Sequence, residues 1–490
     1  MVVETIASRS VGISPMTPLF TGGAVAGGYS GSSSSAPSSV AACASNQTSS
    51  PGDSPQFEIP EPDVVHSNSR ETQEPTADGL DGPARMFPRE WVVVILLVVS
   101  VIINYADRSN LSIASPLIQR QFALSSVQIG TLLSAFFWSY ALLQISGVSG
   151  WVSDRFPVGW VMLGGYVLWS AATVATGLTS SFAALFLSLL LLGVGESVAY
   201  PCYSRIFAEL PQQQRGKANA LIDAGTKLGP AAGAFVGGLL LVHLGWRMLF
   251  VILGAGGLLW VLPWLRLMPR YRRRYASGDV ESLSSIAKLL RVRCAWGAFL
   301  GHFCGNYFFY FLLAWLPIYL VNEQKMSIRS MSRLVSAVFL LIASSTLVTG
   351  WISDRLIAAG ASPTRVRLPV VVVGLTVASC LLVLGLVHGN LPLSITVLAV
   401  ACLGYGAFAS NHWAISQSLA GPAMAGRWTS LQNGVANLAG IVASWVSGLI
   451  LQANGSLRMA FVIAGAVALM GAFLWRFLVR RVEPVQWDAL

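Results

Sequence analysis

The hexapeptide Gly-Trp-Val-Ser-Asp-Arg at residues 150–155 returns as Gly-Trp-Ile-Ser-Asp-Arg at residues 350–355, 200 positions later. Each copy follows the second long apolar segment in a series of six. Such a loop would hardly occur twice at matching positions by chance, so the repeat indicates two parallel, related halves. The glycine permits a close turn, and the aspartate can cap a helix end or pair with an arginine across the two halves. The predicted gate residues are Asp154, Arg155, Asp354 and Arg355.

Apolar segments follow one another from Trp91 onward, and each is long enough to cross a bilayer, which takes about 20 residues. The bilayer interior offers backbone groups no hydrogen-bonding partners, so these segments are predicted to be helices. The sequence therefore predicts an all-α membrane protein with twelve transmembrane helices in two parallel six-helix bundles. The expected spans lie near 90–113, 127–148, 158–178, 182–208, 216–242, 246–266, 296–321, 333–352, 368–388, 392–412, 428–452 and 458–478.

The composition excludes a soluble enzyme. Of 490 residues, 54% are apolar and only 11% are charged, whereas soluble domains carry about 25% charged residues. The chain shows no nucleophile–base set, metal-ligand spacing or phosphate-binding loop, so no catalysis, cofactor or metal is expected. Six cysteines show no metal spacing and form no close set, so no disulfide framework is expected.

The positive charge is distributed as in a membrane protein rather than a nucleic-acid-binding one. The net charge is +10, and residues 88–490 hold 28 basic and 12 acidic residues. With the N-terminus inside, the cytoplasmic loops carry 20 basic residues and the opposite side carries 6, which predicts that both termini are cytoplasmic. We expect a multi-pass protein of the cell membrane, the inner membrane in a Gram-negative bacterium. A monomer without a nucleic-acid partner is expected.

The expected organisation begins with a Ser-, Gly- and Pro-rich tail at 1–87, whose composition favours disorder. Two other interpretations of the tail stay open: translation that starts at Met86, and a targeting segment that faintly resembles a plastid transit peptide. The remaining parts are an N-terminal bundle, a cytoplasmic linker with a basic cluster, a C-terminal bundle and a short tail. Their predicted bounds are 88–268, 269–295, 296–480 and 481–490.

Charged residues at mid-span occur only in the first half. Inserting one charged side chain into the membrane costs at least about 2.5–3.5 kcal/mol, so each such residue is expected to have a structural or functional role. They are Asp107, Arg108, Glu196, Asp223 and Lys227. The second half is predicted to hold only His302 and uncharged polar groups at mid-span. We infer that the first half recognises charge and couples an ion, while the second half shapes the rest of the substrate.

Arg108 is the strongest single candidate for binding the substrate. A guanidinium in a partly dehydrated cavity binds a carboxylate with two hydrogen bonds and stays charged. The competing interpretation is an arginine that snorkels to the outer end of its helix. Glu196 lies about 14 residues, or about 21 Å, into its segment. A carboxyl at that depth can be neutral or charged as its hydration changes, which suits proton coupling, or it can be structural. For Asp223 and Lys227, four residues apart, a mutual salt bridge is the simpler interpretation.

Uncharged polar side chains mark the second half of the candidate site. His302, Asn306 and Tyr310 are spaced four residues apart and are predicted to share one helix face. Asn437 lies in a segment without charges, so its amide must find a partner.

The chain resembles the major facilitator superfamily, whose hallmark is G-x-x-x-D-R followed by further basic residues. Its first copy lacks the second base, because Phe156 and Pro157 follow Arg155. Segments 104–108, 134–140, 193–196, 200–201, 215–216 and 315–320 together look like the anion:cation symporter family. That resemblance implies proton-driven uptake of a small organic anion, a sugar acid such as a hexonate, glucarate or hexuronate.

The same resemblance implies roles for single residues. Arg108 would bind the substrate carboxylate, with Tyr105 and Tyr140 beside it. Asp107 and Glu196 would take part in proton coupling. The residues expected at the sugar end are His302, Trp413 and Asn437.

Two departures keep alternatives open. The family usually has an arginine seven residues before the glutamate, and here that position is Leu189. Lys227 is hypothesised to supply the missing charge, with Asp223 beside it. The glycines and proline of residues 216–233 also nearly match a signature of drug:proton antiporters, so an exporter is the alternative function. The exact substrate and the choice between H⁺ and Na⁺ stay open.

Overall fold

The computed structural model describes residues 88–490, apart from 211, 269–287, 387–389 and 488–490. The predictions for the tail at 1–87 and for most of the linker at 269–295 lie outside the described residues. The elements of the first half are α1 (Pro88–Gln121), α2 (Ser126–Ile145), α3 (Val148–Arg155), α4 (Val158–Leu178), α5 (Phe182–Ser197), α6 (Ala199–Ala208), α7 (Gln212–Gly257), η1 (Leu258–Trp260) and α8 (Val261–Leu267).

The second half repeats this arrangement of long helices. Its elements are α10 (Arg293–Asn322), α11 (Ile328–Ala358), α12 (Pro363–Ala378), η3 (Ser379–Gly385), α13 (Leu391–Asn454) and α14 (Arg458–Leu478). The described part of the chain contains no strand, as expected for a backbone that must satisfy its own hydrogen bonds inside a bilayer.

Polar side chains set where several helices begin. Ser125 caps α2 in a reciprocal arrangement: its hydroxyl accepts from the Gln128 backbone N–H, and the Gln128 side chain accepts from the Ser125 N–H. Ser181, Ser327 and Ser362 cap α5, α11 and α12 in the same position. These caps satisfy backbone donors that the first turn of a helix leaves free.

Two glycines turn long helices back on themselves. Gly245 has φ 75° inside α7, and Gly421 has φ 63° inside α13. Only glycine adopts this backbone conformation without strain. Among the described residues, eleven helices are long and apolar enough to span a membrane. One of them, Lys217–Leu267, has 51 residues and turns at Gly245, so it crosses twice. The twelve predicted crossings are therefore confirmed.

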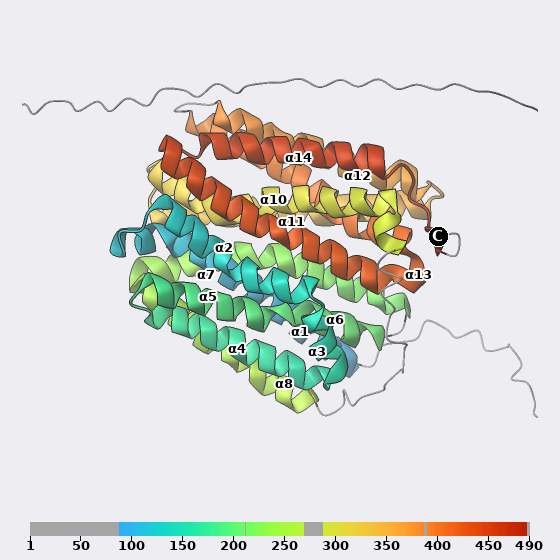
Figure 1. Ribbon diagram of the computed structural model, residues 1–490, viewed down its shortest axis with the longest axis horizontal. Helices are drawn as coiled ribbons and strands as arrows, with labels where there is room; N and C mark the ends of the chain where they lie inside the picture. The colour runs from blue at the N-terminus through green and yellow to red at the C-terminus, as the bar shows by residue number, and fades with distance from the viewer. Residues whose placement is uncertain (1–87, 211, 269–287, 387–389, 488–490) are drawn as a thin grey trace, which may run out of the picture. The chain divides into compact units, whose positions relative to one another are not determined.

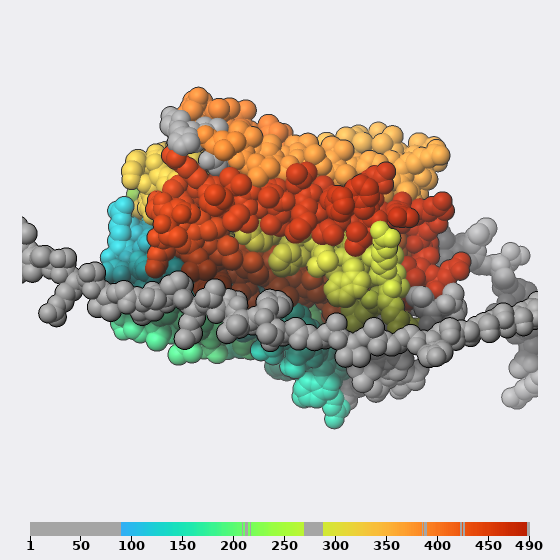
Figure 2. Space-filling view, turned by 45° about the horizontal axis from the view of Figure 1, so that its top comes forward, coloured from blue at the N-terminus to red at the C-terminus, as the bar shows by residue number. Residues whose placement is uncertain are grey.

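The two halves lie side by side, with the first half drawn in blue to green and the second in yellow to red (Figure 1). Helix α2 packs on α13, α7 packs on α11, and α1 packs on α10. Within the second half, α13 and α14 both pack on α10, and their orange-red surfaces adjoin its yellow-green one (Figure 2). The interface between the halves therefore consists of the helices that carry the candidate site.

The two copies of the repeated hexapeptide take different local forms. The first copy lies in the short helix α3, which is separated from α2 by Gly147 with φ 76°. The second copy continues α11 without a break. We call the end of the bundle that holds both copies the motif end, and the end that holds the α1–α2 loop and Gly245 the distal end.

Each gate aspartate pairs inside its own half. Arg205 of α6 lies 3.0 Å from Asp154, and Arg367 of α12 lies 2.8 Å from Asp354. Two roles were expected for these aspartates, a helix cap or a pair with an arginine across the halves. The salt bridges of the described residues instead hold each aspartate within its own half, where α6 packs on α3 and α12 packs on α11. Arg355 instead lies over the Trp351 ring, with 4.3 Å from its Cζ to the ring centroid.

We expect Asp154→Asn to change the free energy of unfolding little. The Asp154 side chain is 74% exposed, and exposed ion pairs contribute only about 0–1 kcal/mol. Thermal unfolding of the detergent-solubilised protein, with Asp354→Asn as the matched variant in the other half, checks this. A loss of several kcal/mol would contradict the assignment of these pairs as weak surface contacts.

The halves touch at the distal end, where α2 crosses α13. A Cβ added at Gly130 would lie 2.8 Å from the Ser444 carbonyl oxygen and 3.2 Å from the Gly448 Cα. Nearby, the Gln452 side chain accepts a 3.3 Å hydrogen bond from the Val127 backbone N–H. Only a glycine allows the two backbones to approach this closely, so the distal end is closed in this structure.

We expect Gly130→Leu to hold the distal end apart, because overpacking this contact costs about 1–3 kcal/mol. A spin-label distance between positions 127 and 452 checks this, and it should lengthen in the variant. Gly164→Leu is the matched control, because a Cβ at Gly164 meets nothing within 4 Å. An unchanged distance in Gly130→Leu would contradict the closure of this end.

Candidate functional site

Helix α1 carries the central charged residues at mid-length. Arg108 and Asp107 are only 8% and 5% exposed, and Ser109, Asn110 and Ser112 continue the polar side of the helix. The Arg108 side chain therefore points into protein. The interpretation of Arg108 as an arginine that snorkels to the membrane surface does not describe this structure.

Arg108 pairs directly with Glu196 of α5. The Arg108 Nε lies 2.9 Å and its Nη2 lies 2.8 Å from the same carboxylate oxygen, Glu196 Oε2. Glu196 is fully buried. Arg108 Nη1 and Glu196 Oε1 find no hydrogen-bond partner among the described residues. Each member of the pair therefore keeps one buried polar atom for a further partner.

Three aromatic rings surround the Arg108 guanidinium. Its Cζ lies 4.5 Å from the ring centroid of Tyr105, 4.3 Å from that of Phe136 and 5.0 Å from that of Tyr140. Rings at this distance attract a cation and fix the plane of the guanidinium. Tyr105 and Tyr140 thus lie beside Arg108, as the resemblance implied, and Phe136 is an additional neighbour that the sequence did not single out.

Asp107 occupies a separate position next to this pair. The Thr173 hydroxyl of α4 lies 3.5 Å from Asp107 Oδ2. None of the salt bridges in the described part of the chain includes Asp107, although Glu196 is close enough to repel it. Two carboxyl groups therefore share one buried region with a single neighbouring arginine.

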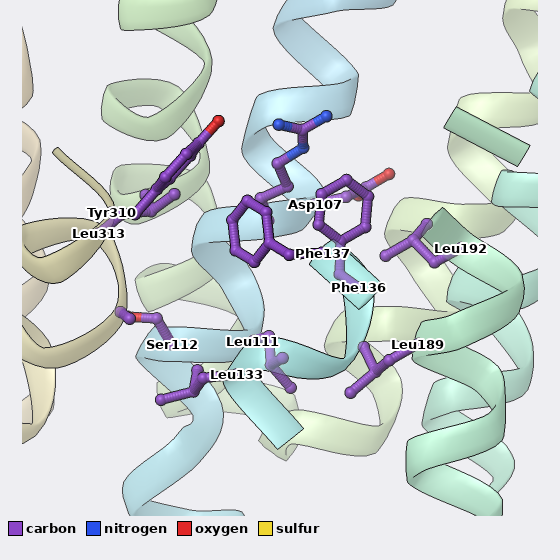
Figure 3. A pocket seen from close by; sticks show the side chains of 12 residues that line it. Asp107, Leu111, Ser112, Leu133, Phe136, Phe137, Leu189, Leu192, Tyr310 and Leu313 are labelled. Carbon is purple, nitrogen blue, oxygen red and sulfur yellow. The ribbon is translucent and has the colours of Figure 1, made fainter. Parts of the chain in front are cut away.

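A cavity opens at Arg108 between the two halves. Figure 3 shows Tyr310 of α10 and Phe137 of α2 converging at one side of this space, with Leu111 and Leu189 at the other. The cavity is lined by Asp107, Arg108, Leu111, Ser112, Leu133, Phe136, Phe137, Leu189, Leu192, Tyr310, Leu313 and Ala314. Apart from the charged groups, Ser112 and Tyr310, the wall is apolar, as in many small-molecule sites.

The polar face of α10 looks toward α13. The Tyr310 hydroxyl donates a 2.7 Å hydrogen bond to Asn437 Oδ1, and Asn306 donates to the Ala436 carbonyl at 3.4 Å. The Phe137 and Tyr310 rings meet across the halves, with centroids 4.5 Å apart. The predicted shared face and the predicted partner for Asn437 are both confirmed.

His302 meets a second histidine that the sequence did not indicate. The ring centroids of His302 and His412 lie 4.4 Å apart, and Trp413 lies 4.9 Å from His302 and 5.2 Å from His412. The prediction that His302 is the sole histidine at depth in the second half is wrong, because α13 runs on past residue 412 to Gly421. The sequence did hold one signal for His412: it directly precedes Trp413, which was already a predicted site residue.

Lys227 forms a salt bridge with Asp223 on the same helix, so the simpler interpretation of these two residues is confirmed. The hypothesis that Lys227 replaces the missing family arginine is wrong in this structure, because Arg108 is the partner of Glu196. Leu189 lines the cavity at the position of that arginine. Glu196 therefore pairs with Arg108 of α1 in this structure.

The glycines that resemble an antiporter signature pack α7 against α1. A Cβ at Gly229 would lie 2.5 Å from the Tyr105 Cβ, and one at Gly233 would lie 2.8 Å from the Ala106 Cα. These small residues allow close helix contact, which either transporter class can use. Among the described residues, no group of His, Cys, Asp and Glu could hold a metal ion.

Sequence comparison identifies the class of protein. The chain matches the Major Facilitator Superfamily over residues 97–444, so it belongs to this superfamily of membrane transporters.

Two named relatives show which transporters of this superfamily the chain is similar to. The chain is 30% identical over 411 residues to the chloroplastic ascorbate transporter of Arabidopsis thaliana, covering 80% of this chain and 75% of that protein. It is 28% identical over 426 residues to the D-galactonate transporter of Escherichia coli O6:H1, covering 81% and 97%. These names agree with the resemblance to anion:cation symporters.

A solved structure shows the same fold. The crystal structure of a bacterial homologue of the human lysosomal transporter Spinster, inward-facing and unoccupied, matches with a TM-score of 0.67. The identity is 19%, and the match covers 81% of this chain and 98% of that one. At this identity the likeness supports the fold alone.

Proposed function

We propose that this chain is a secondary active transporter that carries a small organic anion, a sugar acid, into the cell together with a proton. The observation that carries the proposal is the buried Arg108–Glu196 pair, in which one guanidinium nitrogen lacks a partner among the described residues. An arginine at the interface between the halves suits a carboxylate ligand. The relatives named for ascorbate and D-galactonate support an anionic substrate.

The pair itself supplies the coupling. A substrate carboxylate needs the two nitrogens that Glu196 Oε2 now holds. A proton on Glu196 removes its negative charge and releases those nitrogens, so the proton and the anion bind together. Asp107 is the second proton-coupling residue in this scheme. Tyr105 and Tyr140 hold the guanidinium in place, and the groups at the sugar end are His302, Trp413 and Asn437.

The remaining parts of the proposal concern the whole chain. Both termini face the cytoplasm of a cell membrane, and the protein works as a monomer without a cofactor. The bundles at 88–268 and 296–480 rock about the central site. The gate residues Asp154, Arg155, Asp354 and Arg355 lie at the cytoplasmic, motif end, where their pairing within each half changes during the cycle.

Uptake into proteoliposomes tests the function and its direction. With acid outside, labelled D-galactonate should accumulate inside, and a protonophore should abolish the accumulation. Replacing Na⁺ by choline should change nothing. An exporter of the drug:proton antiporter class would instead move its cargo outward under the same gradient, and that result would overturn the proposal.

A further inference from the structure

Helix α10 reaches the outer surface of the protein near its start. Along the apolar part of this helix, 89% of the residues are buried inside the protein. Trp296 and Leu300, four residues apart on one face, are nonetheless 39% and 37% exposed. Figure 2 shows the yellow-green start of α10 between the orange-red surfaces of α13 and α14. The surface at this place is therefore built from helices of the second half alone.

The neighbours of α10 fix the direction of its exposed face. A Cβ added at Gly297 would lie 2.7 Å from the Leu478 Cβ, so this side of α10 meets α14. The Phe299 ring lies 5.5 Å from the Trp428 ring, so that side meets α13. With 3.6 residues per turn, the two exposed residues project between these directions, where no other helix covers them.

Aromatic side chains surround this opening at the ends of two membrane spans. The Trp296 indole N–H donates a 2.8 Å hydrogen bond to the Leu290 carbonyl, which holds the ring at the start of α10. Phe473 and Phe477 of α14 are 57% and 46% exposed, with ring centroids 4.3 Å apart. The α14 span ends one residue after Phe477, and the α10 span begins three residues before Trp296. Aromatic rings at such positions are typical of the boundary between acyl chains and headgroups.

Two guanidinium groups meet at Phe477. Arg293 Nη2 donates to the Phe477 carbonyl at 3.4 Å. The Arg476 Cζ lies 5.7 Å from the centroid of the Phe477 ring. Both arginines are exposed, and none of the salt bridges in the described ranges includes either of them. The two cations therefore stand together, without a carboxylate, at the depth of lipid headgroups.

Few acidic side chains oppose these cations. Among the described residues after 287 there are three carboxylates. Glu323 lies at the distal end, where it accepts from the backbone at the start of α14, and Asp354 is held by Arg367. The third, Glu483, follows two exposed arginines at 480–481. The electrostatic field around the opening is therefore positive.

The end of the chain fixes this region at the motif end. The Val482 backbone N–H donates a 2.9 Å hydrogen bond to Thr364 Oγ1 at the start of α12, shortly after the second copy of the hexapeptide. The Trp487 indole N–H donates to the Ala420 carbonyl at 2.9 Å. The segment that follows α14 is thus tied to α12 and α13, and its arginines are held beside the opening.

We propose that α10 and α14 bind one anionic phospholipid at the motif end, with its phosphate between Arg293 and Arg476. Its acyl chains would lie along Phe473 and Leu300. A lipid fits this place better than a soluble anion, because the cations stand beside exposed rings at the ends of two spans. The inference goes beyond the proposed function, since it involves neither the Arg108 cavity nor the transported anion.

Competition between two lipids with the same acyl chains tests the site. Phosphatidylglycerol carries a net negative charge, and phosphatidylcholine carries none. We expect the full-length protein in detergent to bind phosphatidylglycerol at least about fivefold more tightly, the effect of a single cation, as counted by native mass spectrometry. Equal binding of the two lipids would overturn the proposal.

Substitution of both arginines should remove this preference. The double variant Arg293→Gln, Arg476→Gln should bind phosphatidylglycerol about 25-fold more weakly, about fivefold for each cation, and should bind phosphatidylcholine as before. The matched control, Arg365→Gln with Lys217→Gln, removes two exposed cations of α12 and α7 at the same end. It should keep the native preference. An equal loss in the control would show general attraction by charge and would overturn a defined site.

Folding of the double variant is checked separately by thermal unfolding in phosphatidylcholine alone, where it should match the native protein. If it unfolds earlier, Arg476→Gln by itself leaves the contact of Arg293 with α14 in place. That single variant should lose phosphatidylglycerol about fivefold. An unchanged affinity in a folded variant would contradict the site.

The source of the phosphate is tested with glycerol 3-phosphate, which has a charged phosphate but no acyl chains. A large excess of it should leave phosphatidylglycerol bound, because the rings of α14 contribute only to a ligand with acyl chains. Displacement of the lipid would identify a site for soluble anions and would overturn the proposal. Neither result depends on uptake of a sugar acid, so the proposed function is tested independently.

Discussion

Arg108→Ala is expected to lower sugar-acid uptake at least about 100-fold, the largest effect of any single substitution considered. The guanidinium is the only cation in the described cavity lining, and a buried charge-assisted pair with a carboxylate is worth about 2–5 kcal/mol when one partner is removed. Arg108→Lys should recover only part of the uptake, because an ammonium cannot offer two parallel donors. Initial uptake rates and calorimetric affinities measure both losses.

The folding of this variant must be separated from its function, because alanine leaves Glu196 buried without its partner. The double variant Arg108→Ala, Glu196→Gln removes both charges and should fold well while still failing to bind the anion. Arg120→Ala is the matched control, since Arg120 is exposed at the end of the same helix. Uptake that survives in a well-folded Arg108→Ala protein would place the anion elsewhere.

The sequence predicted the fold well because its main signals are local. Apolar length marks each crossing, and the hexapeptide at 150–155 and 350–355 marks the two halves. The turns at Gly245 and Gly421 lie in the gaps that the sequence left between predicted spans, at 243–245 and 413–427. The pairing of Asp154 with Arg205 was not predictable in the same way, because it depends on how α6 packs on α3.

The sequence predicted which charged residues belong to the candidate site, but it did not predict which of them pair with one another. Burial of a charge in a membrane helix identifies Arg108 and Glu196 separately. Their contact depends on the angle at which α1 and α5 face one another, which one sequence does not show. His412 was missed because its place inside the bundle depends on the length of α13. Gln432 was missed as well, because only its hydrogen bonds to Trp428 and His302 show that it belongs to the site.

Glu196→Gln is expected to separate anion binding from proton movement. In the native pair, Glu196 Oε2 occupies Arg108 Nε and Nη2, so a carboxylate that is to take two parallel hydrogen bonds from Arg108 requires that this oxygen lose its charge. Where Glu196 is ionised, the uptake of one proton with each anion makes the affinity rise about tenfold for each pH unit lowered. Glutamine is neutral at every pH, so the variant should bind with the same affinity throughout this range.

Transport by Glu196→Gln should likewise lose its dependence on protons. The variant should still exchange labelled for unlabelled anion, because exchange needs no net proton movement, but an acid exterior should no longer drive accumulation. Calorimetry between about pH 5.5 and 8, with counterflow and gradient-driven uptake in proteoliposomes, measures all three properties. Glu483→Gln, an exposed carboxyl in the C-terminal segment, should behave as the native protein does. A Glu196→Gln protein that keeps the native pH dependence and still accumulates the anion would show that the proton is carried elsewhere, with Asp107 as the next residue to substitute.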